Sequence, residues 1–519
     1  MVAHALDPLP DLCAWVLFPT GVTPWSADDW HTWGFADVRT AIESIGAWIK
    51  NTNWNGIGFD VEKWLVSGHS NGGQGTTYIM THWPDSVVAA APVSGYLSIP
   101  QYVPYQFWRP MEPKRWAVVD AALNSWRLEL MIENAKNIPI QQQHGSKDDN
   151  VPVYHSRLMY HLLGEIGSVS NFTELPGSGH WFNGVMTTDN LKSFYESALE
   201  NSAGNVEEDI FTLIVGNPAD TGSKNGFKVL HLKDPGLFGR LRVEFERDAL
   251  IMRIKTENIL DFAVDSGRFG TLKQLSIDGQ TFNLANVATL GLTDPITFWQ
   301  QRDDRIEECL ALEKCWRCSL QQKSPSFLRT GRQLGGVDAI LRTRGSFVIN
   351  YTEPKAFNVA LQISRNLHTY FYADSEIIGT LPALIPPRSG NRITVAMGTT
   401  VPECRNPRPF AIRFSSAAPR RLSVRNHQGY WHQIVAEEGS LGAIWVQPLS
   451  DERLELVVWG EDEEGLAQAA RLVPTITGVG VPDFVILDGK AKYRGADGVL
   501  AMGFFDSWWN VTNASYISD

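Results

Sequence analysis

Residues 66–75 read VSGHSNGGQG, so four glycines, two serines and one histidine fall within a single short stretch. The stretch contains the pattern G-x-S-x-G, in which a serine occupies a sharp turn between a strand and a helix. Small residues on both sides of Ser70, here Gly68 and Gly72, let the strand and helix backbones approach each other. The stretch therefore predicts a nucleophile elbow with Ser70 at its tip.

The flanks of this turn fit the same interpretation. Residues 64–66 are a short apolar run suited to a buried strand, and residues 76–80 continue as a helix that ends before Pro84. A flexible glycine loop would contain the same bare pattern. The presence or absence elsewhere in the chain of residues that could act with Ser70 distinguishes a nucleophile elbow from a flexible loop.

Length and composition exclude several classes of protein. With 519 residues, 43% of them hydrophobic and 20% charged, the chain has a globular composition and room for about two to four domains. A net charge of -12 without a Lys/Arg cluster argues against a nucleic-acid partner. Five cysteines are too few for a disulfide scaffold, and no run of about 18 apolar residues predicts a membrane span. The N-terminal residues lack the pattern of a signal peptide, and the location, cytoplasmic or secreted, stays open.

Short apolar segments alternate with helical segments through residues 1–205. Such alternation predicts a parallel sheet with helices on both faces, in which the loops after the strands carry the chemistry. The expected strands are residues 14–18, 64–66, 87–93, 138–140 and 172–175, and the expected helices include residues 36–49 and 153–163.

Two of these loops carry residues that could act with the elbow serine. The loop QHGSKDDNVP at 143–152 contains Asp148 and Asp149, and the loop PGSGHW at 176–181 contains His180. The order serine, aspartate, histidine along the chain is typical of α/β-hydrolases and differs from the orders in chymotrypsin-like and subtilisin-like enzymes. The three features together are far more specific than the elbow alone.

With these loops the sequence resembles the catalytic domain of the prolyl oligopeptidase family of serine peptidases, including its dipeptidyl-peptidase branch. The resemblance rests on the elbow, on HGSKDDNVPV and on GSGHW, together with the separations between them, and it covers roughly residues 14–200. It implies an α/β-hydrolase fold in which Ser70 is the nucleophile, Asp148 the acid and His180 the base. No metal and no cofactor are expected.

The chemistry of serine, histidine and aspartate side chains supports the same three roles without reference to the family. A serine hydroxyl is a poor nucleophile at neutral pH, so His180 must accept its proton and a carboxylate must hold the imidazole in the right tautomer. Asp149 is the rival carboxylate, and its alternative role is a hydrogen bond within the loop. The backbone N–H of Asn71, the residue after the nucleophile, is expected to stabilise the oxyanion. His69 should point elsewhere, and His144 should pack or bond within its own loop.

The start of the sheet departs from this pattern. An α/β-hydrolase usually places its nucleophile after the fifth strand, but only residues 14–18 offer a strand before Trp64, so about three strands and one oxyanion donor are missing. A truncated chain and a true variant whose sheet edge is covered by later domains both fit, and we favour truncation. Trp25 to Trp33 form a loop that either borders the site or only packs.

Beyond residue 205 the pattern changes. Short strands separated by turn signals predict a small β-sandwich-like, all-β module over residues 206–298. Residues 299–340 are charged and partly helical, and Cys309, Cys315 and Cys318 fit unpaired helix cysteines better than a metal site that lacks a fourth ligand.

Alternation of strands and helices returns in residues 341–519. It predicts a C-terminal α/β accessory domain that packs on the hydrolase or shapes access to it. The acidic run at 460–465 fits the start of a helix, where carboxylates are stabilised by the helix dipole, better than it fits a metal site.

These features predict a serine hydrolase that acts through an acyl-enzyme, most simply a peptidase of the prolyl oligopeptidase type with a peptide substrate. A carboxylesterase is an alternative, because activated esters tolerate an impaired oxyanion hole better than amides do. An inactive hydrolase-like scaffold that binds a ligand or partner is another. The oligomeric state is not predicted.

Overall fold

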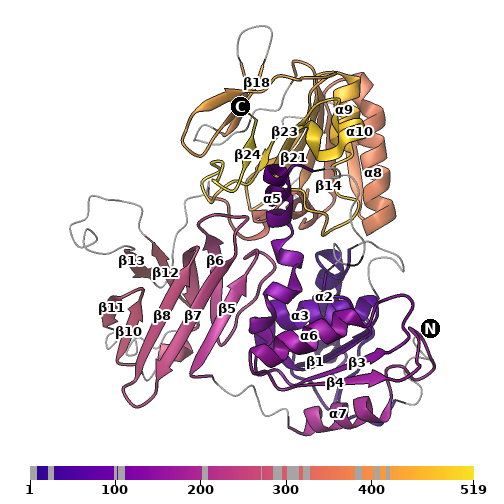
Figure 1. Cartoon of the computed structure of the whole chain (residues 1–519), viewed down its shortest axis with the longest axis vertical. Helices are drawn as coiled ribbons and strands as arrows, with labels where there is room; N and C mark the ends of the chain where they lie inside the picture. The colour runs from indigo at the N-terminus through magenta and orange to yellow at the C-terminus, as the bar shows by residue number, and fades with distance from the viewer. Residues whose placement is uncertain are drawn as a thin grey trace.

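Three units follow one another along the chain in the computed structural model (Figure 1). The first contains a parallel sheet with helices, the second two mostly antiparallel sheets, and the third a large mixed sheet. The structure describes residues 9–20, 28–98, 102, 111–201, 208–269, 272–283, 295–300, 315–319, 328–379, 389–400, 404, 410–415 and 421–518.

The first unit is built on four parallel strands in the order β1-β2-β3-β4. Its elements are β1 Trp64–His69, β2 Val87–Val93, β3 Ile140–Gly145, β4 Ser170–Leu175, α2 Trp33–Asn51, α3 Asn71–His82, α6 Tyr154–Glu165 and α7 Asp189–Glu200. One core cluster joins α2, α3 and α6 to one face of the sheet, and a second joins α7 to the other face (Figure 1). The run VVAAAPV of β2 is almost wholly buried because both faces are covered, as is typical of a parallel sheet. The predicted α/β-hydrolase-like architecture of this region is confirmed.

Residues 14–18 do not form the strand that the sequence predicts. They are irregular and exposed, and the ring of Trp15 lies 6.3 Å from that of Trp48 and 6.0 Å from that of Trp54. Within the described part of the chain, β1 pairs only with β2, so its other edge bonds no described strand. An apolar run becomes a strand only where a neighbour accepts its backbone hydrogen bonds, which composition alone does not provide.

Two sheets form the second unit, in the orders β11-β10-β8-β7-β5 and β13-β12-β9-β6. Their strands are β5 Ile210–Val215, β6 Phe227–Leu232, β7 Gly239–Glu246, β8 Ile251–Glu257, β9 Ile259–Val264, β10 Gln274–Ile277, β11 Gln280–Asn283, β12 Ile296–Gln300 and β13 Trp316–Ser319. One core cluster contains residues of both sheets, including Leu241 of β7 and Phe262 of β9, so the sheets pack face to face. These strands span residues 210–319, so the sheets extend beyond residue 298.

The described parts of residues 299–340 contain strand β13 as well as the 3₁₀ helix Gly331–Gln333 and most of the 3₁₀ helix Val337–Leu341. Cys318 lies in β13 rather than in a helix, and Cys315, just before this strand, is disulfide-bonded rather than unpaired. Burial of Trp316 in the sandwich core explains why this stretch is a strand. Cys309 lies outside the described residues.

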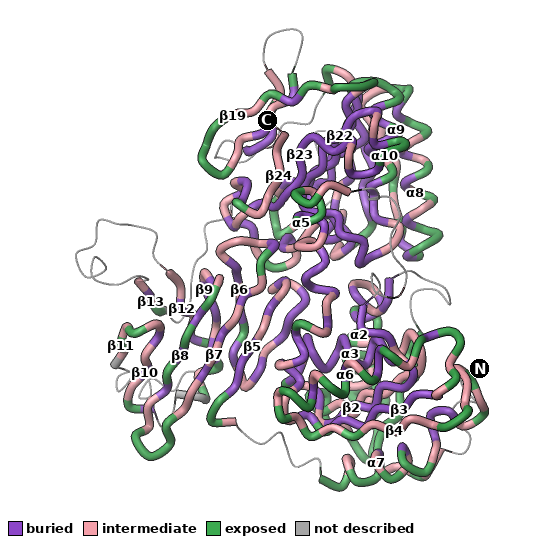
Figure 2. The backbone as a smooth tube through the Cα atoms, in the orientation of Figure 1, coloured by how far each residue is buried: buried purple, intermediate pink, exposed green. Residues whose placement is uncertain are grey.

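The third unit has an eight-stranded sheet in the order β15-β14-β16-β21-β20-β22-β23-β24. Its main elements are β14 Phe347–Tyr351, α8 Phe357–Phe371, β15 Ser375–Ile378, β16 Arg392–Met397, β20 Gly442–Pro448, β21 Leu454–Gly460, α9 Glu463–Ala470, β22 Phe484–Leu487, α10 Ala491–Arg494, β23 Val499–Gly503 and β24 Tyr516–Ile517, beside a small sheet of β17 Ile412–Phe414, β18 Leu422–Arg425 and β19 Trp431–Gln433. The central strands are buried, and the outer surface of α8 is exposed (Figure 2). In the acidic run at 460–465, Asp462 accepts the N–H groups of Glu464 and Gly465 and thereby caps α9.

The third unit packs on the first through a helix and a loop. Helix α5, Pro113–Ala122, contacts β23 and β24, and Arg115 Nε donates to the backbone oxygen of Val499 at 2.9 Å (Figure 1). Trp33 Nε1 donates to the backbone oxygen of Leu341 at 2.7 Å. The N-terminus of α2 is thus fixed by a residue more than 300 positions away.

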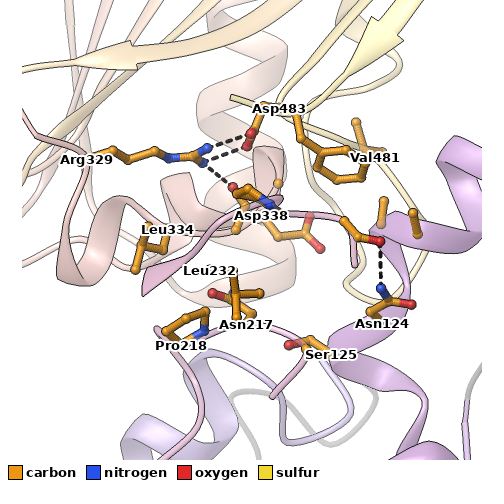
Figure 3. Close-up of a pocket in the computed structure, with 18 of the residues that line it drawn as sticks. Asn124, Ser125, Asn217, Pro218, Leu232, Arg329, Leu334, Asp338, Val481 and Asp483 are labelled. Carbon is orange, nitrogen blue, oxygen red and sulfur yellow. Dashed lines mark hydrogen bonds and ion pairs between the residues drawn. The ribbon is translucent and has the colours of Figure 1, made fainter. Parts of the chain in front are cut away.

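A cavity of about 60 Å³ lies where the three units meet (Figure 3). Asn124 and Ser125 line it from the first unit, Asn217 from the second, and Asp338 from the third. No described residue hydrogen-bonds Asp338 Oδ1, although this carboxyl group is buried. The junction therefore contains a carboxyl group that is incompletely satisfied.

Candidate active site

Strand β1 ends at His69 and helix α3 begins at Asn71, so Ser70 alone makes the turn between them. Its backbone has φ 60° and ψ -118°, a conformation that is costly for a residue other than glycine and that often marks functional sites. A Cβ at Gly68 would lie 2.2 Å from the backbone oxygen of Gly72, so the predicted need for glycine at position 68 agrees with the structure. A Cβ at Gly72 would meet no atom within 4 Å, and the predicted need for a second small residue there is wrong.

The elbow serine, the acid loop and the histidine loop meet at one edge of the sheet. Ser70 Oγ lies 2.9 Å from His180 Nε2, and His180 Nδ1 lies 2.7 Å from Asp148 Oδ2. The three residues follow β1, β4 and β3, whose carboxyl ends lie together because the strands are parallel. A carboxylate can only accept, so His180 Nδ1 donates to Asp148, which leaves Nε2 to accept the hydroxyl proton of Ser70.

The side chain of Asp148 is buried and is bonded on both oxygens. Its Oδ1 accepts the N–H groups of Asn150 at 3.0 Å and Val151 at 2.8 Å, and its Oδ2 lies 3.2 Å from His144 Nε2. Burial alone would raise the pKa of Asp148, but the hydrogen bonds from His180 and from these backbone groups outweigh it and hold the pKa below its usual value. The arrangement therefore favours the carboxylate form.

Two neighbours of Asp148 lie where the sequence suggested. Asp149 is exposed, and it is Asp148 that contacts His180. His144 is buried and bonds within the acid loop and to the following helix, with Nε2 2.9 Å from the backbone oxygen of Val151 and Nδ1 2.8 Å from Ser156 Oγ.

His69 does not point away from the site, contrary to expectation. Its Nε2 donates to the backbone oxygen of His180 at 2.7 Å, and the two imidazole rings lie 4.7 Å apart. Burial lowers the pKa of His69 to about 4, so the ring is neutral near pH 7. His69 therefore ties the elbow to the histidine loop, and nothing in the spacing of the sequence predicts this contact.

The loop before α2 reaches the elbow through a residue that the sequence did not single out. Asn71 Nδ2 donates to Asp29 Oδ1 at 2.7 Å and lies 2.9 Å from the hydroxyl oxygen of Tyr96. We expected the loop from Trp25 to Trp33 either to border the site or only to pack. Its described part does both, because it contacts Asn71 and also packs on the third unit. Trp25 itself lies outside the described residues.

The backbone N–H of Asn71 lies at the start of α3, directly after Ser70. The first N–H groups of a helix have no acceptor within the helix, and the helix dipole favours negative charge there. This group can therefore stabilise an oxyanion that forms next to Ser70. Among the described residues we identify no second donor for that position.

The described part of the chain offers neither a metal site nor a membrane-spanning helix. No group of three or more His, Cys, Asp or Glu side chains there is arranged to hold a metal ion. Nor does any described helix combine the length and the apolar composition needed to cross a membrane.

The parallel sheet, the elbow and the converging loops define an α/β-hydrolase-like region. Residues 24–202 match the family model named Peptidase_S9, described as the prolyl oligopeptidase family. The chain thus contains a domain of the prolyl oligopeptidase family, as the sequence motifs predict.

Similar proteins differ in how much of the chain they match. A curated protein of Arthroderma benhamiae described as "Uncharacterized secreted protein" is 39% identical over 529 residues, a match that covers 100% of this chain and 54% of that protein. The chain therefore spans about half the length of this curated relative.

Two similar solved structures each match about a third of the chain. A Pyrococcus horikoshii acylaminoacyl peptidase is 17% identical with a TM-score of 0.27, and the match covers 34% of this chain and 29% of the peptidase. Arabidopsis thaliana SOBER1 is 21% identical with a TM-score of 0.19, over 32% of this chain and 65% of that one. Neither likeness informs about the substrate.

Proposed function

We propose that this protein is a serine hydrolase that forms an acyl-enzyme on Ser70. The observation that carries the proposal is the continuous hydrogen-bonded chain from Ser70 Oγ through His180 to Asp148, with distances of 2.9 and 2.7 Å. A triad is recognised by such geometry and by the role of each group rather than by sequence position. The match of residues 24–202 to the prolyl oligopeptidase family supports the same conclusion.

In the acylation step, Ser70 Oγ attacks the carbonyl carbon of the substrate while its proton moves to His180 Nε2. Asp148 accepts the Nδ1 proton of His180 in a hydrogen bond and stabilises the imidazolium that forms. The carbonyl oxygen becomes an oxyanion beside the N–H of Asn71. His180 then gives the proton from Nε2 to the leaving amine or alcohol as the bond between carbon and leaving group breaks.

Deacylation reverses these roles with water as the nucleophile. Water loses a proton to His180 Nε2 and its oxygen attacks the acyl carbon, and the second tetrahedral intermediate again places its oxyanion at Asn71. The proton returns to Ser70 Oγ as the ester bond breaks and the carboxylic acid leaves. The two steps together consume the substrate and one water molecule and return Ser70 and His180 to their starting protonation states.

Within this class we favour a peptidase of the prolyl oligopeptidase type, because the family of the domain supports it. An amide leaving group must be protonated, and His180 Nε2 is positioned to supply that proton. Ester hydrolysis is the second candidate. A site with the Asn71 N–H as its single oxyanion donor would favour an ester, since losing a donor typically raises the barrier by about 2.7 to 4 kcal/mol.

The test compares steady-state hydrolysis of p-nitroanilides and p-nitrophenyl esters that carry the same acyl group. The proposal predicts turnover by the wild type and a loss of about 10⁴-fold or more in kcat for Ser70→Ala and for His180→Ala. Ser44→Ala, an exposed serine on α2, is the matched control and should retain activity.

The anilide and ester substrates distinguish the peptidase from the esterase. Turnover of the anilide supports the peptidase, and turnover of the ester alone supports the esterase. A folded wild type that turns over neither would overturn both and leave an inactive scaffold.

A further inference from the structure

Three side chains from three separate segments form a closed hydrogen-bonded cluster behind the elbow. Asn71 Nδ2 donates to Asp29 Oδ1 at 2.7 Å and lies 2.9 Å from Tyr96 OH, and the Tyr96 hydroxyl donates to the same Asp29 oxygen at 2.8 Å. Asp29 comes from the loop before α2, Asn71 from the first turn of α3, and Tyr96 from the loop after β2. Each pair in the cluster is in contact, so Asn71 has little freedom to move.

The position and conformation of Asp29 cost folding free energy. Its side chain is only 6% exposed, and no described residue hydrogen-bonds its second oxygen, Oδ2. Asp29 and the next residue, Trp30, both have positive φ, at 50° and 63°. Strain and an unsatisfied buried oxygen in one residue persist only where the surrounding structure enforces them, and such features cluster at functional sites.

The protonation behaviour of Asp29 reflects the same environment. Burial raises its pKa to about 6, although the hydrogen bonds from Tyr96 and Asn71 partly oppose the shift. With this pKa, Asp29 is mostly a carboxylate near pH 7 and can accept hydrogen bonds from both Asn71 and Tyr96.

The first turn of α3 depends on this cluster for restraint. The N-cap residue Ser70 makes no side-chain hydrogen bond to the helix, because its hydroxyl is directed to His180. The Asn71 side chain belongs to the same residue whose backbone N–H faces the elbow. A contact that fixes the side chain of Asn71 therefore also fixes the direction of its N–H.

We propose that Asp29 is a positioning residue, which holds Asn71 so that the backbone N–H of Asn71 points at the oxyanion position. This inference rests on the proposed function, since it concerns the same reaction. Displacement of a catalytic group by about 1 Å can cost on the order of 10²-fold in rate. Loss of the Asp29 acceptor should therefore lower kcat by about 10- to 100-fold and change KM by less than about threefold.

Two substitutions at position 29 distinguish the effect of the hydrogen bond on kcat from the effect of the backbone strain. Asp29→Gly keeps the positive φ and removes the acceptor, whereas Asp29→Asn tolerates the same φ and keeps an acceptor oxygen. The kcat of each, normalised to the fraction of active sites titrated by a fluorophosphonate, should be low for Asp29→Gly and within about threefold of wild type for Asp29→Asn. A merely structural role would change the titrated fraction and not the normalised kcat.

A double-mutant cycle with Asn71→Ala completes the test. Asn71→Ala keeps the backbone N–H and removes the side chain that Asp29 holds, so it should show the same loss as Asp29→Gly, and the double variant should lose no more than either single one. Losses that multiply, or an Asp29→Gly variant with the kcat of the wild type, would overturn this inference and leave the proposed function intact. A wild type without Ser70-dependent turnover would overturn both.

Discussion

At Asp148 three donors converge on one carboxylate: two backbone N–H groups on Oδ1, and His180 on Oδ2. Such a site is specific for a side chain that accepts hydrogen bonds and donates none. An amide at this position would direct an N–H toward one of these donors, and the histidine could keep its contact only in the wrong tautomer. The chemistry of position 148 thus depends on charge and acceptor capacity rather than on shape.

Asp148→Asn is therefore expected to lower kcat by about 10³- to 10⁴-fold while the protein stays folded. Asp149→Asn, the same substitution on the exposed neighbour, should leave kcat within about twofold of wild type. Steady-state kinetics of both variants on one ester substrate provide the measurement. Equal losses in the two variants would show that the loop, and not the Asp148 carboxylate, carries the effect.

The residues of the site differ in how far the sequence could predict them. Ser70, Asp148 and His180 each lie in a loop that follows a strand of one parallel sheet, so motif and order sufficed. Asp29 and His69 act through contacts with residues 42 and 111 positions away. Asp29 belongs to no motif, and His69 occupies a position that the pattern G-x-S-x-G leaves unspecified. Contacts of that kind depend on tertiary packing, which a single sequence does not reveal.

At the scale of elements, the elbow depends on the close approach of β1 and α3. The two glycines of G-x-S-x-G are unequal, because only a Cβ at Gly68 would overlap backbone atoms, those of Gly72. Gly72 is a helical residue with open space where its Cβ would lie. In this pattern, therefore, position 68 requires glycine and position 72 tolerates a larger residue.

This inequality predicts opposite effects for two matched substitutions. Gly68→Ala should destabilise the protein by more than about 3 kcal/mol, since a backbone overlap must be relieved by moving a strand. Gly72→Ala should be neutral or stabilise it by up to about 1 kcal/mol, because alanine favours a helix. Urea unfolding of both variants measures this, and a Gly68→Ala variant as stable as wild type would contradict the account of the elbow.

The elements themselves were predictable to different degrees. Strand β2 begins and ends at the predicted residues, since it is a short apolar run covered on both faces. Residues 14–18 have a similar composition and form no strand, because the described sheet offers them no neighbour. Composition predicts which segments can form strands, and the presence of a hydrogen-bonding neighbour decides which of them do.

At the scale of the whole molecule, the three units share buried charges at their junction. Arg329 and Asp483 form a bidentate ion pair, with Nη2 2.6 Å from Oδ1, next to the cavity shown in Figure 3. Asp338 faces the same junction, and burial raises its pKa to about 7, although the charge of Arg342 partly opposes the shift. Removing one partner of a buried ion pair is strongly destabilising, whereas neutralising a buried carboxylate that is incompletely hydrogen-bonded should do the reverse.

Asp338→Asn should therefore make the protein more stable at pH 8. Between pH 4 and 7 the folded protein holds a proton on Asp338 that the unfolded chain has released, so this group lowers stability as the pH rises through that range. Asparagine does not titrate, and the difference in Tm between variant and wild type should grow from pH 5 to pH 8, toward a few degrees. A variant that is less stable at every pH would contradict this account of the junction.

Ser70, His180 and Asp148 should assemble into a reactive triad within this chain. Labelling of the purified protein with a fluorophosphonate, followed by mass spectrometry of the peptide that contains Ser70, measures whether they do. We expect stoichiometric labelling at Ser70 in the wild type, none in Ser70→Ala, and a loss of at least about 10³-fold in labelling rate in His180→Ala. A folded wild-type protein that stays unlabelled, or that is labelled elsewhere, would rule the triad out.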